Sequence, residues 1–213
     1  MKNDQLVIKS INDQTKIFND FFGLNIKIDF ALPTLPSEAD GWFVFPKNRD
    51  IFSLLKTRAM TNYLERINVY RFERTENALE KIGDAPYSVV ACQLGKKYVD
   101  KMSLEDAHNL FGPSEFGLTT DMVASIILTH PEIFYLSPGF VCSGQRLTSL
   151  KDGGMQHTPI LYHLGKRIVY SSERISIGQK NILTGFLEKN IFDSYKYYDT
   201  ECYDEGCDNW EEE

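Results

Sequence analysis

Apolar residues recur with a helical period at the start of the chain. One face at 3.6-residue spacing collects Val7, Ile8, Ile11, Phe18, Phe21 and Phe22. Gly23 follows directly, and glycine often ends a helix because it adopts the left-handed conformation at little cost. We therefore predict an amphipathic helix that stops at Gly23.

More helices are predicted further along the chain. Apolar residues between about 50 and 66 lie within half of a helical circumference. Ser103 is a helix N-cap followed by two acids, which favour the positive end of the helix dipole. Thr119 or Thr120 caps a helix that Pro131 ends, and apolar residues surround its axis. We expect this last helix to be central and buried.

Other runs have the pattern of strands, with alternating or continuous apolar residues between turn residues. We interpret seven runs in this way: residues 24–30, 42–45, 69–72, 87–94, 140–147, 159–164 and 167–171. The last two are joined through Gly165 and Lys166 and predict a hairpin. Residues 182–187 predict a final short amphipathic helix, which Gly185 weakens.

Helices mixed with short, mostly sequential strands predict an α+β fold. We expect one domain in which a mixed or largely antiparallel sheet packs with helices. A parallel βαβ arrangement of residues 24–94 is the alternative. The chain has 213 residues, 42% of them hydrophobic, which is enough to bury a core without disulfide or metal support.

The net charge of -7 belongs to the C-terminal segment. Residues 195–213 hold eight acids and one lysine, whereas residues 1–194 balance at 22 acids and 22 bases. We therefore divide the chain into a globular domain, 1–194, and an acidic, aromatic-containing tail, 195–213. A neutral body offers no broad basic surface, so nucleic acid binding is unfavourable. The main support for nucleic acid binding is the alternation of arginines with aromatic residues between Arg66 and Arg74.

Aromatic side chains set the tail apart from an ordinary solvated segment. Tyr198, Tyr203 and Trp210 lie among its acids, whereas disordered segments contain few aromatics. Aromatic anchors in an acidic field can dock on a basic partner or on the body of the same chain. We treat these three residues as candidate binding residues for a protein partner, with a disordered tail as the alternative.

Sequence features favour a cytoplasmic location and no membrane attachment. The chain starts with a polar segment, not a signal-peptide apolar block, and no apolar run approaches the roughly 18 residues needed to cross a bilayer. The four cysteines are widely spaced, which fits reduced thiols.

The common catalytic motifs are absent from the sequence. It has no Gly-rich nucleotide loop, no His-Glu-x-x-His, no Gly-x-Ser-x-Gly and no Cys-x-x-Cys, so we predict no cofactor and no metal. An enzyme remains a competing hypothesis, with its site between residues 130 and 173. Its candidate catalytic residues are a Cys142 nucleophile, Arg146 as activator or anion anchor, and the bases His130, His157 and His163.

Two of these candidates, Cys142 and His130, also have a purely structural interpretation. Cys142 lies in an apolar strand pattern, where free cysteine is usually a small buried residue. His130 precedes Pro131 at a predicted helix end, where it can act in capping alone.

One stretch, from Val90 to Phe134, carries a resemblance. Its segments 91–95, 112–118 and 128–132 resemble an uncharacterised family of bacterial or phage proteins that has no assigned activity. The resemblance implies no catalytic residue. It draws attention to a loop-and-helix unit containing Thr129 and His130, and to Glu115 as a candidate binding residue.

Taken together, these features favour a cytoplasmic protein-binding or regulatory protein whose tail is the docking element. An enzyme built on Cys142, Arg146 and the histidines is the first alternative, and a nucleic-acid-associated factor is the second.

Overall fold

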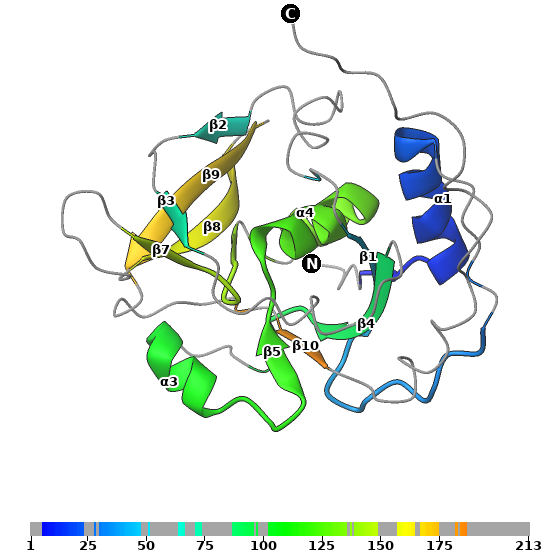
Figure 1. Cartoon of the computed structure of the whole chain (residues 1–213), viewed down its shortest axis with the longest axis horizontal. Helices are drawn as coiled ribbons and strands as arrows, with labels where there is room; N and C mark the ends of the chain where they lie inside the picture. The colour runs from blue at the N-terminus through cyan, green and yellow to red at the C-terminus, as the bar shows by residue number, and fades with distance from the viewer. Residues whose placement is uncertain are drawn as a thin grey trace, which may run out of the picture.

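Two sheets and several helices make up the computed structural model (Figure 1). It describes residues 6–23, 28, 30–47, 51, 64–66, 71–73, 87–95, 97, 102–135, 137, 139–148, 157–164, 167–174, 182 and 184–186. The elements in chain order are α1 (Ile11–Phe22), β1 (Gly41–Pro46), β2 (Leu64–Arg66), β3 (Arg71–Glu73), β4 (Tyr87–Gln93), α3 (Leu104–Asn109), β5 (Glu115–Gly117), α4 (Thr120–Thr129), the 3-10 helix η2 (Pro131–Tyr135), β6 (Gly139–Val141), β7 (Arg146–Thr148), β8 (His157–Leu164), β9 (Arg167–Arg174) and β10 (Thr184–Phe186).

The strands form two separate sheets. The first has the order β1-β4-β10-β5, and every neighbouring pair is antiparallel. The second has the order β2-β9-β8-β7-β3, with β6 also paired to β8, and its single parallel pair is β2 with β9. The predicted α+β class is confirmed. The parallel alternative is wrong for β1 and β4, which run antiparallel from Gly41 opposite Cys92 to Pro46 opposite Tyr87.

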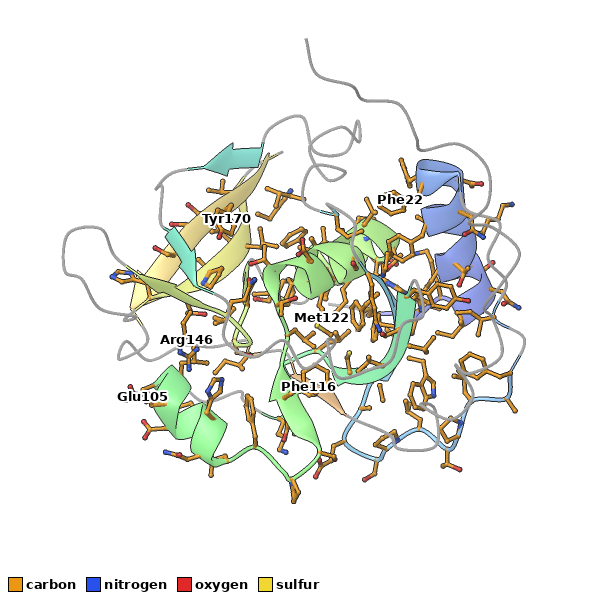
Figure 2. All side chains as sticks on the ribbon, in the orientation of Figure 1. Phe22, Glu105, Phe116, Met122, Arg146 and Tyr170 are labelled. Atoms are coloured by element: carbon orange, nitrogen blue, oxygen red, sulfur yellow. The ribbon has the colours of Figure 1, made fainter. Side chains whose placement is uncertain are left out.

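Helix α4 is the centre of the core, as its apolar pattern predicts. Every residue of α4 except Asp121 is buried, and the helix packs against β1 and against β8. In Figure 2 its Met122 lies among the side chains in the middle of the molecule. Thr119 is the N-cap and accepts a hydrogen bond from the Met122 N–H, while His130 ends the helix before Pro131. This burial fits a helix in which residues 122–124 and 126–128 are all apolar.

Helix α1 lies alongside β1 and begins later than the periodicity predicts. Its N-cap is Ser10, whose Oγ accepts from the Asp13 N–H at 3.1 Å, so the predicted face residues Val7 and Ile8 precede the helix. Its end is as predicted, because Gly23 adopts a φ of 66° in the left-handed region.

The outer edge of β1 is covered by one buried side chain of α1. The Gln14 amide nitrogen donates to the carbonyls of Trp42 and Lys9, both at 2.9 Å. Its oxygen accepts from the Val44 N–H at 3.0 Å. The Gln14 amide thus replaces the peptide group of a further strand, and satisfies backbone groups that an edge strand would leave open.

The predicted helix over 182–187 is wrong, because residues 184–186 form β10. Gly185 of this strand lies between Cys92 of β4 and Phe116 of β5. Pairing on both edges satisfies backbone groups of three strands at once, and this outweighs a weak helical pattern that already contains a glycine.

Two other expectations differ from the structure in part. Residues 64–66 are strand β2 and not the end of a helix, and most of the predicted helix over 50–66 lies outside the described residues. Residues 28 and 30 are not in a strand. The tail, with Tyr198, Tyr203 and Trp210, also lies outside the described residues, so the boundary at residue 194 stays a prediction. Among the described helices, none has the length and apolar character required to cross a membrane.

Candidate functional site

The turn over residues 142–145 joins β6 to β7 and is held by backbone contacts. The Gln145 N–H donates to the Cys142 carbonyl at 3.1 Å, and the Gly144 N–H donates to the Leu118 carbonyl at 2.9 Å. Gly144 and Gly117 of β5 lie backbone against backbone. A Cβ on Gly117 would lie 2.5 Å from the Gly144 nitrogen, so both positions need glycine.

Side chains fix the same turn to α4 and β8. The Gln145 Oε1 atom accepts from the Thr120 N–H at 2.9 Å and from the Thr120 hydroxyl, which satisfies a donor at the start of α4. From β8, the Thr158 hydroxyl contacts the carbonyls of Cys142 and Gln145, at 3.1 and 3.2 Å. The turn is therefore rigidly placed between the two sheets.

Arg146, labelled in Figure 2, directly follows this turn, and its side chain forms a hydrogen bond with His108 of α3. The Arg146 Nη1 atom donates to the carbonyls of Ser143 and Gln145, at 3.3 and 3.4 Å, and Nη2 donates to His108 Nδ1 at 3.0 Å. His108 Nε2 lies 3.0 Å from the Ser143 carbonyl, which can only accept. His108 is therefore neutral, with its proton on Nε2.

Electrostatics agree that the His108 ring is neutral. Burial and the neighbouring Arg146 guanidinium lower the pKa of His108. Arg146 itself is half-buried. Burial lowers the pKa of its guanidinium, and the negative charge of Glu105 partly opposes this effect. The pair thus carries one positive charge at neutral pH.

Cys142 is fully buried and poorly suited to act as a nucleophile. Burial raises its pKa to about 12, although a hydrogen bond with Thr120 acts in the opposite direction. The predicted activation by Arg146 is absent among the described contacts, because that guanidinium binds carbonyls and His108 instead. Since the thiolate is the reactive form, this geometry argues against the catalytic hypothesis for Cys142.

His130 is also buried, and both of its ring nitrogens are used. Nε2 accepts from the Lys9 N–H at 2.9 Å, and Nδ1 lies 2.8 Å from the Thr129 hydroxyl. The Thr129 hydroxyl in turn donates to the Ser125 carbonyl. Burial and the charge of Lys9 lower the pKa of His130 to about 4, so the ring is neutral at pH 7. The bond to Lys9 connects the segment before α1 to the end of α4.

The other two histidines lie apart on β8. His157 begins the strand opposite Arg174, whereas His163 pairs with Ile168 near the other end. Six residues of extended strand span about 20 Å. His163 is exposed and stacks on Phe134, with ring centroids 5.1 Å apart. The five candidate catalytic residues are thus not gathered in one centre.

Glu115 forms an ion pair with the exposed Lys97. Its carboxylate is fully buried and accepts from Lys97 Nζ and, at 3.0 Å, from the Gly112 N–H. Burial disfavours the ammonium of Lys97, but the bond to Glu115 outweighs this effect and raises the pKa of Lys97. Glu115 therefore joins two loops, and its carboxylate faces a lysine of the same chain.

An apolar pocket of about 430 Å³ lies beside the start of α1. Its walls are residues 8–12, Ile28, Phe30, Leu32 and the start of β1 at Gly41 and Trp42. Gly41 provides room for one wall, because a Cβ there would lie 2.7 Å from a methyl group of Ile8. The pocket is held in shape from behind by the Gln14 and His130 bonds to Lys9.

Sequence reasoning missed this pocket and the role of His108. The pocket joins three segments, 8–12, 28–32 and 41–42, which no local motif links. His108 and Arg146 are 38 positions apart. All four histidines lie between residues 108 and 163, which indicates a region of interest in the sequence. This clustering does not distinguish His108 from the other three.

Neither a metal site nor a family assignment follows from the described residues. No group of three His, Cys, Asp or Glu side chains is placed among them to hold a metal ion. The side chains of Arg66 and of residues 71–74 lie outside the described part of the chain, so the structure does not test the nucleic-acid hypothesis. No protein-family model matches the chain, and no match was found among curated proteins or solved structures. The family resemblance of residues 90–134 stays a prediction.

Proposed function

We propose that this chain is a non-catalytic, cytoplasmic protein-binding protein, and that the pocket beside α1 receives an apolar side chain of its partner. The observation that carries the proposal is the pocket itself, whose volume of about 430 Å³ falls within the usual range of binding pockets. Its walls are mainly apolar side chains, which suits an aromatic or aliphatic anchor.

The fate of the candidate catalytic groups supports binding over catalysis. Cys142 is buried as a neutral thiol, and both ring nitrogens of His130 are engaged by the fold. A general base needs a nitrogen within reach of a substrate, and the His130 ring offers none, while His157 and His163 lie near opposite ends of β8.

The surroundings of the pocket suit a protein partner. Ser10 and Asn12 are exposed at its edge and provide polar groups, and Val7 is 77% exposed in the adjacent segment. An apolar centre within a polar rim is the usual anatomy of a protein interface. The acidic tail, with Tyr198, Tyr203 and Trp210, is proposed as a second docking element on the same partner.

A matched pair of substitutions tests the pocket. L32D places a charge on the pocket wall, whereas L110D makes the same change at a leucine that is 59% exposed on another part of the molecule. We expect affinity capture from the native host lysate to recover a partner with the wild-type chain and L110D, and to lose it with L32D. The L32M variant keeps the pocket apolar and should retain the partner.

Capture by L32D at the wild-type level, or no partner with the wild-type chain, would contradict the proposal. Thermal unfolding of each variant shows whether L32D is folded, and L32A provides a milder change if it is not. A truncated chain, 1–194, tests the tail separately: loss of the partner there supports tail docking, and full retention rejects it.

A further inference from the structure

We propose that Arg146, held by His108 and the 142–145 turn, is the anchor of a second binding site that takes an oxyanion, the carboxylate or phosphate of a small ligand. This site is formed by α3 and β7 and shares no residue with the pocket beside α1. It stands independently of the function proposed above.

Charge balance is the first argument. Arg146 is half-buried, and its hydrogen-bond acceptors are the Ser143 carbonyl, the Gln145 carbonyl and a neutral imidazole. Among the described residues, no carboxylate forms an ion pair with it. Glu105 is near enough to act on its charge but does not contact it (Figure 2). A half-buried cation without a paired anion favours an oxyanion from solution.

Donor geometry is the second argument. A guanidinium has five N–H donors in a planar fork. Two of the described bonds come from Nη1 and one comes from Nη2, which has two N–H groups. Nε has no described acceptor, and it is the neighbour of Nη2 in the fork. Two adjacent N–H groups match the two oxygens of a carboxylate or phosphate.

Rigidity is the third argument. The backbone contact of Gly117 with Gly144 and the bonds of Gln145 and Thr158 fix the residues that precede Arg146. His108 holds the Nη2 end, and its own ring is fixed by Ser143 and by Phe111, with ring centroids 4.7 Å apart. Donors that are ordered before binding lose little entropy when an anion arrives.

An aromatic ring next to His108 narrows the ligand class. Phe111 is half-buried, and its ring centroid lies 4.7 Å from that of His108. We infer an oxyanion attached to an apolar or aromatic group. Inorganic phosphate and benzoate are suitable probes for the two sources of charge.

Nuclear magnetic resonance of the full chain tests the site through the Nε–H signal of Arg146, assigned by its loss in R146K. We expect this signal to shift saturably when phosphate or benzoate is added, and the shifts of neighbouring amides to disappear in R146Q. E105Q removes the nearby negative charge and should tighten binding roughly two- to fivefold. D20N makes the same charge change on the exposed face of α1 and should leave the affinity unchanged.

Each outcome decides the proposal. Saturation with phosphate alone assigns the site to phosphate ligands, and saturation with benzoate alone assigns it to carboxylates. No saturable shift with either probe, or equal shifts of the neighbouring amides in R146Q, would overturn it. Equal effects of E105Q and D20N would also overturn it, because they would show a response to net charge. This last comparison decides the question even if R146Q fails to fold.

Discussion

Histidines in this chain act as neutral hydrogen-bonding groups at two places. In His130 one nitrogen accepts from a backbone N–H and the other lies against a hydroxyl, while His108 receives a guanidinium donor. Each arrangement is lost when the ring takes a second proton, because the accepting nitrogen becomes a donor. His130, chosen from the sequence as a candidate base, therefore contributes to stability through its lowered pKa.

We predict that His130 makes the protein sensitive to acid. Its pKa is about 4 in the folded state, against a reference of about 6.5 for the unfolded chain. The unfolded chain therefore takes up the proton first. Stability is full above pH 6.5 and falls as the pH drops toward 4, by at most about 3 kcal/mol. Urea unfolding at several pH values measures this loss.

Two variants isolate the contribution of His130 to this acid sensitivity. H130N should be less stable at pH 7 but should lose less stability between pH 6.5 and 4. His163 is exposed, so H163N should keep the wild-type dependence. The same pH slope in wild type and H130N would show that His130 is not responsible.

Cys142 leads to a prediction about reactivity. Because its side chain is fully buried and its pKa is raised to about 12, it should resist alkylation in the folded protein. Cys92, buried beside Asp40 with a raised pKa, should behave in the same way. Peptide mapping after iodoacetamide treatment, with and without urea, measures both. Rapid labelling of Cys142 without urea would restore the nucleophile hypothesis.

At the scale of elements, small local contacts decide where strands and helices meet. The Gly117 and Gly144 backbones bring β5 against the 142–145 turn, and the Gln14 amide closes the edge of β1. Neither contact has a periodic signal in the sequence, because each depends on one residue and on a partner far along the chain.

We predict that G117A lowers the free energy of unfolding by about 2 kcal/mol or more. The new Cβ would lie 2.5 Å from the Gly144 nitrogen, and this backbone cannot move without disturbing the turn. Gly112 provides the control, since the nearest atom to a Cβ there is 3.9 Å away. Denaturant titration should show G112A near the wild type; equal losses in both variants would contradict the close-contact explanation.

A second prediction at this scale concerns Gln14. Q14A leaves the Val44 N–H and the Trp42 carbonyl without their described partner, which should cost about 2–3 kcal/mol. The open edge of β1 should also promote association between copies. Size-exclusion chromatography and urea unfolding measure the two effects. K16A, on the exposed side of the same helix, should change neither.

Across the whole molecule, the sequence predicted local features better than long-range ones. Caps at Ser103 and Thr119, the stop at Gly23 and the β8–β9 hairpin follow from neighbouring residues, and the structure confirms them. The division into two sheets does not, because it depends on which distant strands pair. The Arg146–His108 pair was missed for the same reason, although Arg146 itself was a candidate.

The position of β10 has a consequence for the order in which the chain acquires its structure during synthesis. Residues 184–186 are the last described strand, yet they lie between β4 and β5, which the ribosome makes about 90 and 70 residues earlier. Until β10 emerges, β4 and β5 lack the strand that joins them, and one edge of β4 is unpaired. A nascent chain therefore completes its first sheet only after all described strands of its second sheet have been synthesised. Termination of translation before β10 yields an aggregation-prone product.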